Sequence, residues 1–445
     1  MPVEPTFSPT VRFPGLIAVE RPFSVPLDHA QPHGEQIEVF AREVRAPGGE
    51  RRPWLVFLQG GPGFGAPRPT GSFGSGAVGG WVGRAVQDFR VLLLDQRGTA
   101  RSTPVNRQTL PTRGDAAQQA DYLTHFRADS IVRDCELIRK HLVGDEPWTV
   151  LGQSFGGFCT TAYLSIAPEG LRRALICGGL PSLDGHAEDV YRAAYPRMVR
   201  KNTAFYERYP ADVERVLRIA GHLAEHEVTL PGGMTLTVEA FQSLGLMLGM
   251  SDGYERLHYL LEGALLEIDG KTQLSDKFQE AVQHELSFAG HPIYALLHEA
   301  CYAQGGRPTA WSAERVRAEF PEFSPKRATS GDGDAPLLFT GETIHPWHFH
   351  TDPALRPLRE VADLLAERTA WPPLYDADVL AENRVPVAAA VYAEDLYVDV
   401  VHSTQTAEHI RGLRRWITNE YEHDGLRSSG DGVFERLWRM ADGEL

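Results

Sequence analysis

The sequence predicts an α/β fold in which a mostly parallel β-sheet is flanked by helices and interrupted by a large, mainly helical insertion. Two observations support this fold class. In residues 1–181, short and nearly all-apolar runs alternate with helical patterns, as buried strands covered by helices on both faces do. Helical patterns then dominate residues 182–383, and the alternation returns in residues 384–445. A chain of 445 residues is long enough for a sheet and such an insertion.

The expected elements follow one another as right-handed crossover connections require. Gln36–Val44 alternates apolar and polar residues, which is typical of a half-buried antiparallel strand. The all-apolar pattern predicts buried strands at Trp54–Leu58, Val91–Leu94, Trp148–Leu151 and Ala174–Cys177. Helices are expected over Ile131–Leu142 and from about Gly156.

The expected insertion divides the core into two parts. It follows the sixth core strand, and its clearest helical stretches are Ala187–Tyr209 and Phe241–Ile268, with a Gly/Ser/Asp-rich loop at Ala328–Ala335. The core resumes with a strand within Val385–Tyr392, a helix near Thr404–Leu413 and a strand within Arg415–Tyr421. We therefore expect a core of residues 1–181 and 384–445 and a helical cap of residues 182–383.

Composition excludes several classes of partner. The chain carries 44 Lys and Arg against 59 Asp and Glu, a net charge of −15, which disfavours binding to nucleic acid or to anionic membranes. Its 4 cysteines are widely spaced and contain no CxxC pair, as in proteins of reducing compartments. Neither a signal-peptide pattern nor a run of about 18 apolar residues is present. We expect a cytoplasmic protein, and the oligomeric state stays open.

One motif carries chemistry. Gly152-Gln153-Ser154-Phe155-Gly156 fits G-x-S-x-G and lies directly between a predicted strand and a predicted helix. Such a turn holds the serine in a strained conformation above the sheet, and the flanking glycines relieve crowding. The alternative is a glycine-rich turn with an incidental serine. The strand–turn–helix context favours Ser154 as a nucleophile.

A serine nucleophile needs a base and an acid that orients the base, in the chain order Ser, Asp or Glu, His. The acid is expected just after a late strand, where Asp395 follows Val385–Tyr392. Glu394 would point to the other side if the strand register continued, and Asp399 lies further along the loop. In the alternative interpretation, Asp395 only caps the next helix.

The base is expected in the loop between the last strand and the last helix. His423 is in that position. His402 and His409 are closer to Asp395 in sequence, but His409 falls on a predicted helix and His402 precedes it. The sequence therefore predicts Ser154, Asp395 and His423 as a catalytic triad.

An acyl intermediate also needs two N–H donors for its oxyanion. Phe155, which follows the nucleophile, should supply one of them. Gly61, in the glycine-rich segment Gln59–Gly65 after a predicted strand, should supply the other. No G-K-[ST] and no GxGxxG pattern accompanies these glycines, so a nucleotide site is not expected.

Four motifs resemble the proline iminopeptidase (prolyl aminopeptidase) family of α/β-hydrolases: Gln59–Gly65, Leu92–Ser102, Gly152–Gly157 and Asn419–Arg427. The resemblance implies an α/β-hydrolase core with a cap, and a serine peptidase that releases an N-terminal residue, usually proline, without a cofactor. Asp95 and Arg97 match the family's DQRG, which we interpret as a loop brace. The sequence departs from the family at Gln59, where a histidine is usual, and in the DQRGTARS segment.

The resemblance also implies acidic groups that bind the substrate's amine. Glu299 and Glu342 lie in apolar and aromatic contexts within the expected cap, and the alternative for each is a surface charge. His345, His348 and His350 could suggest a metal, but Pro346 breaks a helix there, and a pocket wall is the favoured interpretation. The partners expected are peptides with a free N-terminus. A general esterase or amidase, or a non-catalytic binding module, would be the alternative functions.

Overall fold

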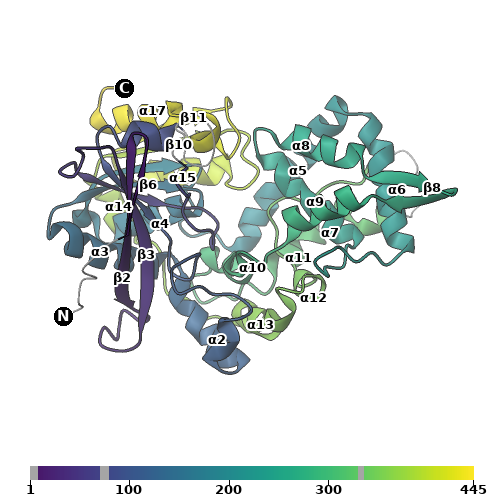
Figure 1. The fold of residues 1–445 in the computed structure, drawn as a ribbon, viewed down its shortest axis with the longest axis horizontal. Helices are drawn as coiled ribbons and strands as arrows, with labels where there is room; N and C mark the ends of the chain where they lie inside the picture. The colour runs from purple at the N-terminus through teal and green to yellow at the C-terminus, as the bar shows by residue number, and fades with distance from the viewer. Residues whose placement is uncertain (1–8, 71–79, 329–334) are drawn as a thin grey trace.

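The computed structural model describes residues 9–70, 80–328 and 335–445. Nine of its strands form one sheet in the order β1-β2-β3-β5-β4-β6-β7-β10-β11 (Figure 1). The parallel part consists of β4 (Trp54–Leu58), β5 (Arg90–Leu94), β6 (Trp148–Gln153), β7 (Leu171–Cys177), β10 (Val387–Tyr392) and β11 (Leu413–Thr418). Antiparallel strands β1 (Thr10–Phe13), β2 (Leu16–Pro26) and β3 (Gln36–Arg45) extend one edge. The predicted fold class is confirmed.

Both faces of the sheet are covered, which explains the all-apolar strands. In β4, Val56 and Leu58 pack into one hydrophobic cluster, and Leu55 and Phe57 pack into another on the opposite face. The first cluster includes residues of α3 (Ala128–Val143) and α4 (Phe155–Ile166). The second includes residues of α1 (Trp81–Ala85) and α17 (Gly432–Asp442). The parallel strands are therefore buried from both sides.

Two N-terminal strands were not expected from the sequence. β2 contains Pro22 and Pro26, and both lie beyond the part of β2 that pairs with β1. There β2 is an edge strand, where proline is tolerated. With β1 and β2 included, the helical insertion follows β7, the seventh strand along the chain, rather than the sixth.

Helices make up most of the segment between β7 and β10, and α5 to α9 lie to one side of the sheet (Figure 1). The longest are α5 (Ala187–Arg208), α6 (Ala211–Glu225), α8 (Gly253–Glu262) and α9 (Asp276–Leu286). The helical expectation is wrong for Leu265–Ile268, which forms a hairpin as β8 with β9 (Lys271–Leu274). The turn between them, Asp269-Gly270, has positive φ at both residues, as a two-residue hairpin turn requires.

The remaining helices close the structure around the sheet. They are α2 (Ala116–Leu123), α7 (Val238–Gln242), α10 (Pro292–Leu297), α11 (Ser312–Arg317), α12 (His348–Thr351), α13 (Arg359–Glu367), α14 (Ala377–Ala381), α15 (Val400–His409) and α16 (Gly425–Ser428). Side chains of α10 and α13 share a third hydrophobic cluster with α2, which ties the insertion to the first part of the core. Most of the loop expected at Ala328–Ala335 lies outside the described residues.

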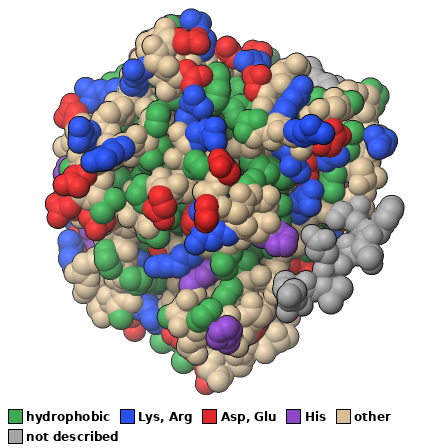
Figure 2. Space-filling model, turned by 90° about the vertical axis from the view of Figure 1, so that its left-hand side faces the viewer, with side chains coloured by type: hydrophobic (Ala, Val, Ile, Leu, Met, Phe, Trp, Pro, Cys, Tyr) green, Lys and Arg blue, Asp and Glu red, His purple; other side chains and the backbone are tan. Residues whose placement is uncertain are grey.

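The surface at the sheet end of the molecule carries charges of both signs. Figure 2 shows Lys and Arg side chains interspersed with Asp and Glu over this face, rather than gathered in a patch of one sign. Among the residues that the structure describes, no helix combines the length and apolar character needed to cross a membrane.

Candidate active site

Ser154 occupies a sharp turn between β6 and α4. Its backbone has φ 55° and ψ −123°, a conformation that non-glycine residues rarely adopt. The Ser154 N–H donates to the carbonyl oxygen of Cys177 at 2.9 Å, which fixes the turn to the end of β7. Strain of this kind persists only where the surrounding structure enforces it, and it is typical of functional sites.

The glycines around Ser154 are required by backbone packing. A Cβ at Gly156 would lie 1.9 Å from the carbonyl oxygen of Leu58, and one at Gly152 would lie 2.2 Å from that of Gly156. A Cβ at Gly157 would come within 2.4 Å of the carbonyl oxygen of Gly179. Rigid backbone cannot move aside for these atoms. The small residues of the motif thus let α4 start directly against the sheet.

His423 and Asp395 form a buried pair. His423 Nδ1 lies 2.7 Å from Asp395 Oδ2, and the two residues are 6% and 1% exposed. Asp395 Oδ1 accepts the backbone N–H groups of Tyr397 at 2.8 Å and Val398 at 3.1 Å. The carboxylate therefore orients the imidazole while its own lone pairs are satisfied.

The other acids considered from the sequence have different positions. Glu394 is exposed, and Asp399 caps α15 by accepting the N–H groups of Val401 and His402. His409 is bound to the carbonyl oxygen of Ala377 at 3.0 Å.

Ser154 and His423 line the same cavity, of about 500 Å³. Within the described part of the chain, no hydrogen bond joins the Ser154 hydroxyl to His423. Catalytic hydrogen bonds are often long before substrate binds, so this spacing is compatible with a nucleophile–base pair.

Three histidines line this cavity and differ in charge behaviour. Burial alone opposes a charge on each of them. It lowers the pKa of His291 to about 4 and that of His348 to about 3. At His423 burial also acts to lower the pKa, but the charge and hydrogen bond of Asp395, with Glu342 and Asp424, raise it above 6.5 overall. His423 is thus the cavity histidine poised to exchange a proton near neutral pH.

The backbone near Ser154 offers the two expected donors. Gly61 lines the cavity, and Phe155 is the first residue of α4, whose N–H groups have no partners within the helix. In the described residues, neither N–H is paired with a protein acceptor. Gly61 has φ 124°, and a Cβ there would lie 2.8 Å from the Phe64 ring, so glycine is needed for this backbone to face the cavity.

Asp95 and Arg97 brace the surrounding loops, which confirms their structural interpretation. Asp95 accepts a bidentate pair from Arg68 at 2.7 and 2.8 Å and the N–H of Ala66 at 2.9 Å. Arg97 is buried and donates to Asp134 at 2.5 and 2.7 Å, and to three backbone carbonyls. The segment after Gly61 is held rigidly by the first of these contacts.

The structure separates the two glutamates. Glu342 lines the cavity with Ser154, and its Oε1 accepts the hydroxyl of Tyr294 at 2.6 Å. Glu299 does not line that cavity. Its carboxylate accepts the N–H groups of Ser312 at 3.1 Å and Ala313 at 2.9 Å, so it caps α11. The expectation that both carboxylates face the substrate is therefore not met, because Glu299 is turned toward a helix terminus.

The histidine-rich segment is bound to its neighbours within the protein. His345 Nδ1 lies 2.7 Å from Glu314 Oε2, His348 stacks on Trp347 at 3.7 Å, and His350 is exposed. The described residues contain no group of three metal-ligating side chains. His348 forms part of the cavity wall, as its aromatic context indicates.

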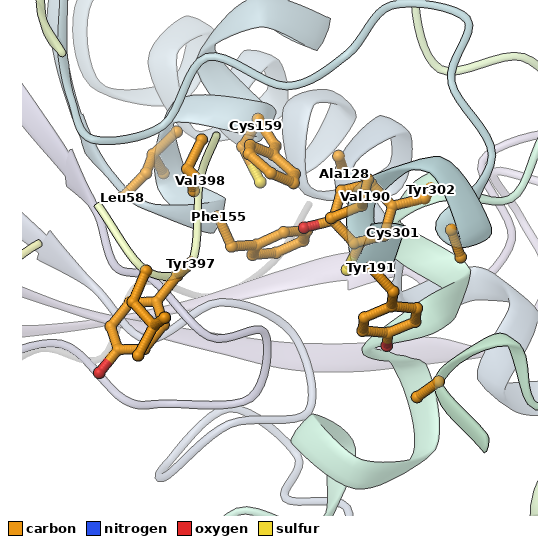
Figure 3. Packing of buried hydrophobic residues seen from close by; sticks show 14 of the residues in the cluster. Leu58, Ala128, Phe155, Cys159, Val190, Tyr191, Cys301, Tyr302, Tyr397 and Val398 are labelled. Carbon is orange, nitrogen blue, oxygen red and sulfur yellow. The ribbon is translucent and has the colours of Figure 1, made fainter. Parts of the chain in front are cut away.

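Two tyrosines of the site were missed from the sequence. The Tyr397 ring meets His423 edge-on at 4.7 Å, and Tyr294 holds Glu342. Tyr397 lies two residues after Asp395, so proximity to the acid was an available signal. In Figure 3, Tyr397 lies to one side of Phe155, whereas Tyr191 and Tyr302 from the insertion lie on the other. The neighbour of the nucleophile is thus covered by the inserted segment.

The family model of the alpha/beta hydrolase fold matches residues 53–425, so fold and site together define an α/β hydrolase. The chain is 48% identical over 421 residues to a proline iminopeptidase of Aeromonas sobria, covering 94% of this chain and 95% of that one. It is 35% identical over 432 residues to a proline iminopeptidase of Aspergillus aculeatus, covering 95% and 93%. The chain belongs to the proline iminopeptidase family of α/β hydrolases, which confirms the resemblance.

Solved structures add little at this level. The crystal structure of VinJ covers 95% of this chain and 98% of its own, with a TM-score of 0.44 and 13% identity. A similarity this low supports no argument about activity.

Proposed function

We propose that the protein is a serine exopeptidase that releases an N-terminal residue, preferentially proline, from peptides through an acyl-enzyme on Ser154. The observation that carries the proposal is Glu342. Its carboxylate lines the cavity of Ser154 and His423, and among the described residues no Lys or Arg forms an ion pair with it. A cationic amine cannot enter an apolar cavity without a compensating charge, and Glu342 supplies one. The names of the two full-length relatives agree with this activity.

The acylation step follows from the positions of the triad residues. His423 Nε2 takes the proton of the Ser154 hydroxyl while Oγ forms a bond to the substrate's carbonyl carbon. The N–H groups of Gly61 and Phe155 bind the resulting oxyanion. His423 then gives the proton to the leaving amine as the C–N bond breaks. Asp395 stabilises the imidazolium between these transfers and holds the required tautomer.

Deacylation reverses the same roles. A water molecule loses its proton to His423 and attacks the acyl carbon, and the proton returns to Ser154 Oγ as the ester bond breaks. The free amino acid or short acyl product leaves, and the triad is restored. No cofactor takes part in this sequence.

An aromatic group beside Glu342 fits a proline ring. Phe64 stacks on His291 at 4.3 Å and meets Tyr294 at 5.6 Å, and Phe288 stacks on Tyr294 at 6.0 Å. All four rings line the cavity. The faces of such rings attract a cation and bury apolar carbon. A pyrrolidinium ring, which is apolar but positively charged at nitrogen, satisfies both preferences.

We also propose that residues 182–383 act as a cap over a core formed by residues 1–181 and 384–445. The cavity lining supports this, because Ser154 and His423 come from the core and Glu342 comes from the insertion. The 4 cysteines are all free and buried, which supports a reducing compartment such as the cytoplasm.

A panel of aminoacyl-naphthylamides, each with a free and a blocked N-terminus, tests the function. We expect hydrolysis of the free prolyl substrate, little hydrolysis of the blocked one, and loss of several orders of magnitude in kcat for Ser154→Ala. Equal rates on free and blocked substrates would indicate a general esterase or amidase instead. Retained activity in Ser154→Ala would refute the mechanism.

A further inference from the structure

Helix α5 contacts three segments that carry site residues. Arg197, Met198, Lys201 and Asn202 are spaced i, i+1, i+4 and i+5, which places them on one face of the helix. All four are buried. Their partners lie 137 to 221 residues away along the chain.

Arg197 holds the segment of the catalytic acid. Its Nη1 donates to the backbone carbonyl of Asp395 at 2.7 Å, and its Nη2 donates to Asp399 Oδ2 at 2.9 Å. The guanidinium thus grips the loop after β10 at two points that the Asp395 side chain does not use. A planar fork of this kind fixes direction as well as distance.

Lys201 holds the segment of the catalytic base, one turn further along α5. Its Nζ lies 2.5 Å from Glu422 Oε1, and Glu422 directly precedes His423. Burial raises the pKa of Glu422 although Lys201 lies beside it. Loss of the lysine would leave a buried carboxyl group without its cation, which is costly enough to displace the loop.

Asn202 and Met198 hold the segment of Glu342. The Asn202 side-chain amide donates to the carbonyl of Phe339 and accepts the Phe339 N–H, both at 2.8 Å. The N–H of Gly341, the residue before Glu342, lies 3.2 Å from Met198 Sδ. The segment that ends at Glu342 therefore follows the position of α5.

We propose that Arg197, Lys201 and Asn202 are positioning residues, and that this face of α5 sets the relative placement of Asp395, His423 and Glu342. Arg197 and Lys201 act through the triad, so their loss lowers kcat. Asn202 acts through Glu342, so its loss weakens recognition of the amine. This division rests on the proposed function for Asn202 alone, because the triad can be tested on a substrate without an amine.

The first experiment measures kcat and KM for an ester without an amine in Arg197→Met and Lys201→Met. Displacement of a triad group by about 1 Å costs up to about 100-fold, so we expect kcat to fall about 10- to 100-fold while KM changes little. Lys201→Arg should restore most of the rate, since it keeps the ion pair with Glu422. Arg200→Met, an exposed position on the same helix, is the matched control and should behave as wild type.

Folding is separated from positioning in two ways. Rates are normalised to the sites that a fluorophosphonate titrates, and thermal unfolding is recorded for each variant. If a Met variant does not fold, Arg197→Lys decides, because lysine keeps the charge but loses the two-point grip. Its kcat should lie between those of wild type and an unpositioned triad. Normalised kcat values equal to wild type in Arg197→Met and Lys201→Met, or in Arg197→Lys alone, would overturn the proposal.

The second experiment compares Asn202→Ala with Thr203→Ala, an exposed neighbour, on a free prolyl amide and on the ester. We expect Asn202→Ala to raise KM for the prolyl amide by about tenfold, since a buried pair of backbone bonds is lost, and to leave the ester kcat nearly unchanged. Equal effects on both substrates would show a merely structural role. If wild type does not distinguish free from blocked N-termini, the proposed function fails, and the ester experiment still decides the roles of Arg197 and Lys201.

Discussion

Glu342→Gln tests the recognition of the substrate's amine most directly. The substitution keeps the shape and the hydrogen bond from Tyr294 but removes the charge. A charge-assisted contact is worth about 1.5–3 kcal/mol, and each 1.36 kcal/mol corresponds to a factor of ten. We therefore expect kcat/KM for a free prolyl amide to fall about 10- to 150-fold. The low exposure of the cavity favours the upper part of this range, because water does not screen the charge there.

The assay compares the prolyl amide with an ester that has no amine, in Glu342→Gln and Glu299→Gln. Glu299 is the matched control, since it has the same chemistry but caps α11 away from the cavity. Only Glu342→Gln should lose activity, and only on the prolyl amide. Equal losses on the two substrates, or a larger loss in Glu299→Gln, would refute the assignment of the amine to Glu342.

Three further predictions concern protonation. The pKa of His423 is raised above 6.5, so kcat/KM should fall with acid on a limb above pH 6.5; a limb well below that value would contradict the electrostatics. Asp395→Asn should reduce kcat by about 10⁴-fold with little change in KM, whereas Glu394→Gln, at an exposed position, should be nearly silent; the reverse result would reassign the acid. Burial raises the pKa of Glu299 from 4.5 to about 7, so folding favours its protonated form. The free energy of unfolding should therefore drop by ~3 kcal/mol as pH rises from 4.5 to 7, and denaturant titrations should show this slope lost in Glu299→Gln.

The parts of the fold that local pattern determines could be predicted from the sequence. Strand β4 matches its expected bounds because five apolar residues in a row fit only a strand buried on both faces. The turn at Ser154 was predictable for the same reason, since its glycines and its flanking elements are contiguous in the chain. Strand β8 was missed although Asp269-Gly270 is a strong hairpin signal. There the apolar run before the turn fitted a helix equally well.

Contacts between distant segments could not be predicted in this way. Glu299 and Glu342 both lie in apolar contexts, and their different roles depend on which helix or cavity each side chain faces in the folded chain. The grip of Arg197 on the acid loop joins residues 198 positions apart, and no local pattern encodes it. Tertiary packing decides such positions.

The crowding of glycines around the nucleophile has a consequence for mutational surveys of this enzyme. In a library that samples every substitution, Gly152, Gly156 and Gly157 should tolerate replacement as poorly as Ser154 itself. The origins of this intolerance differ. Substituted glycines should deplete the cellular abundance of the protein, whereas substituted Ser154 should leave abundance intact and abolish turnover. A survey scored by growth alone would therefore assign catalytic importance to residues whose contribution is only the absence of a side chain.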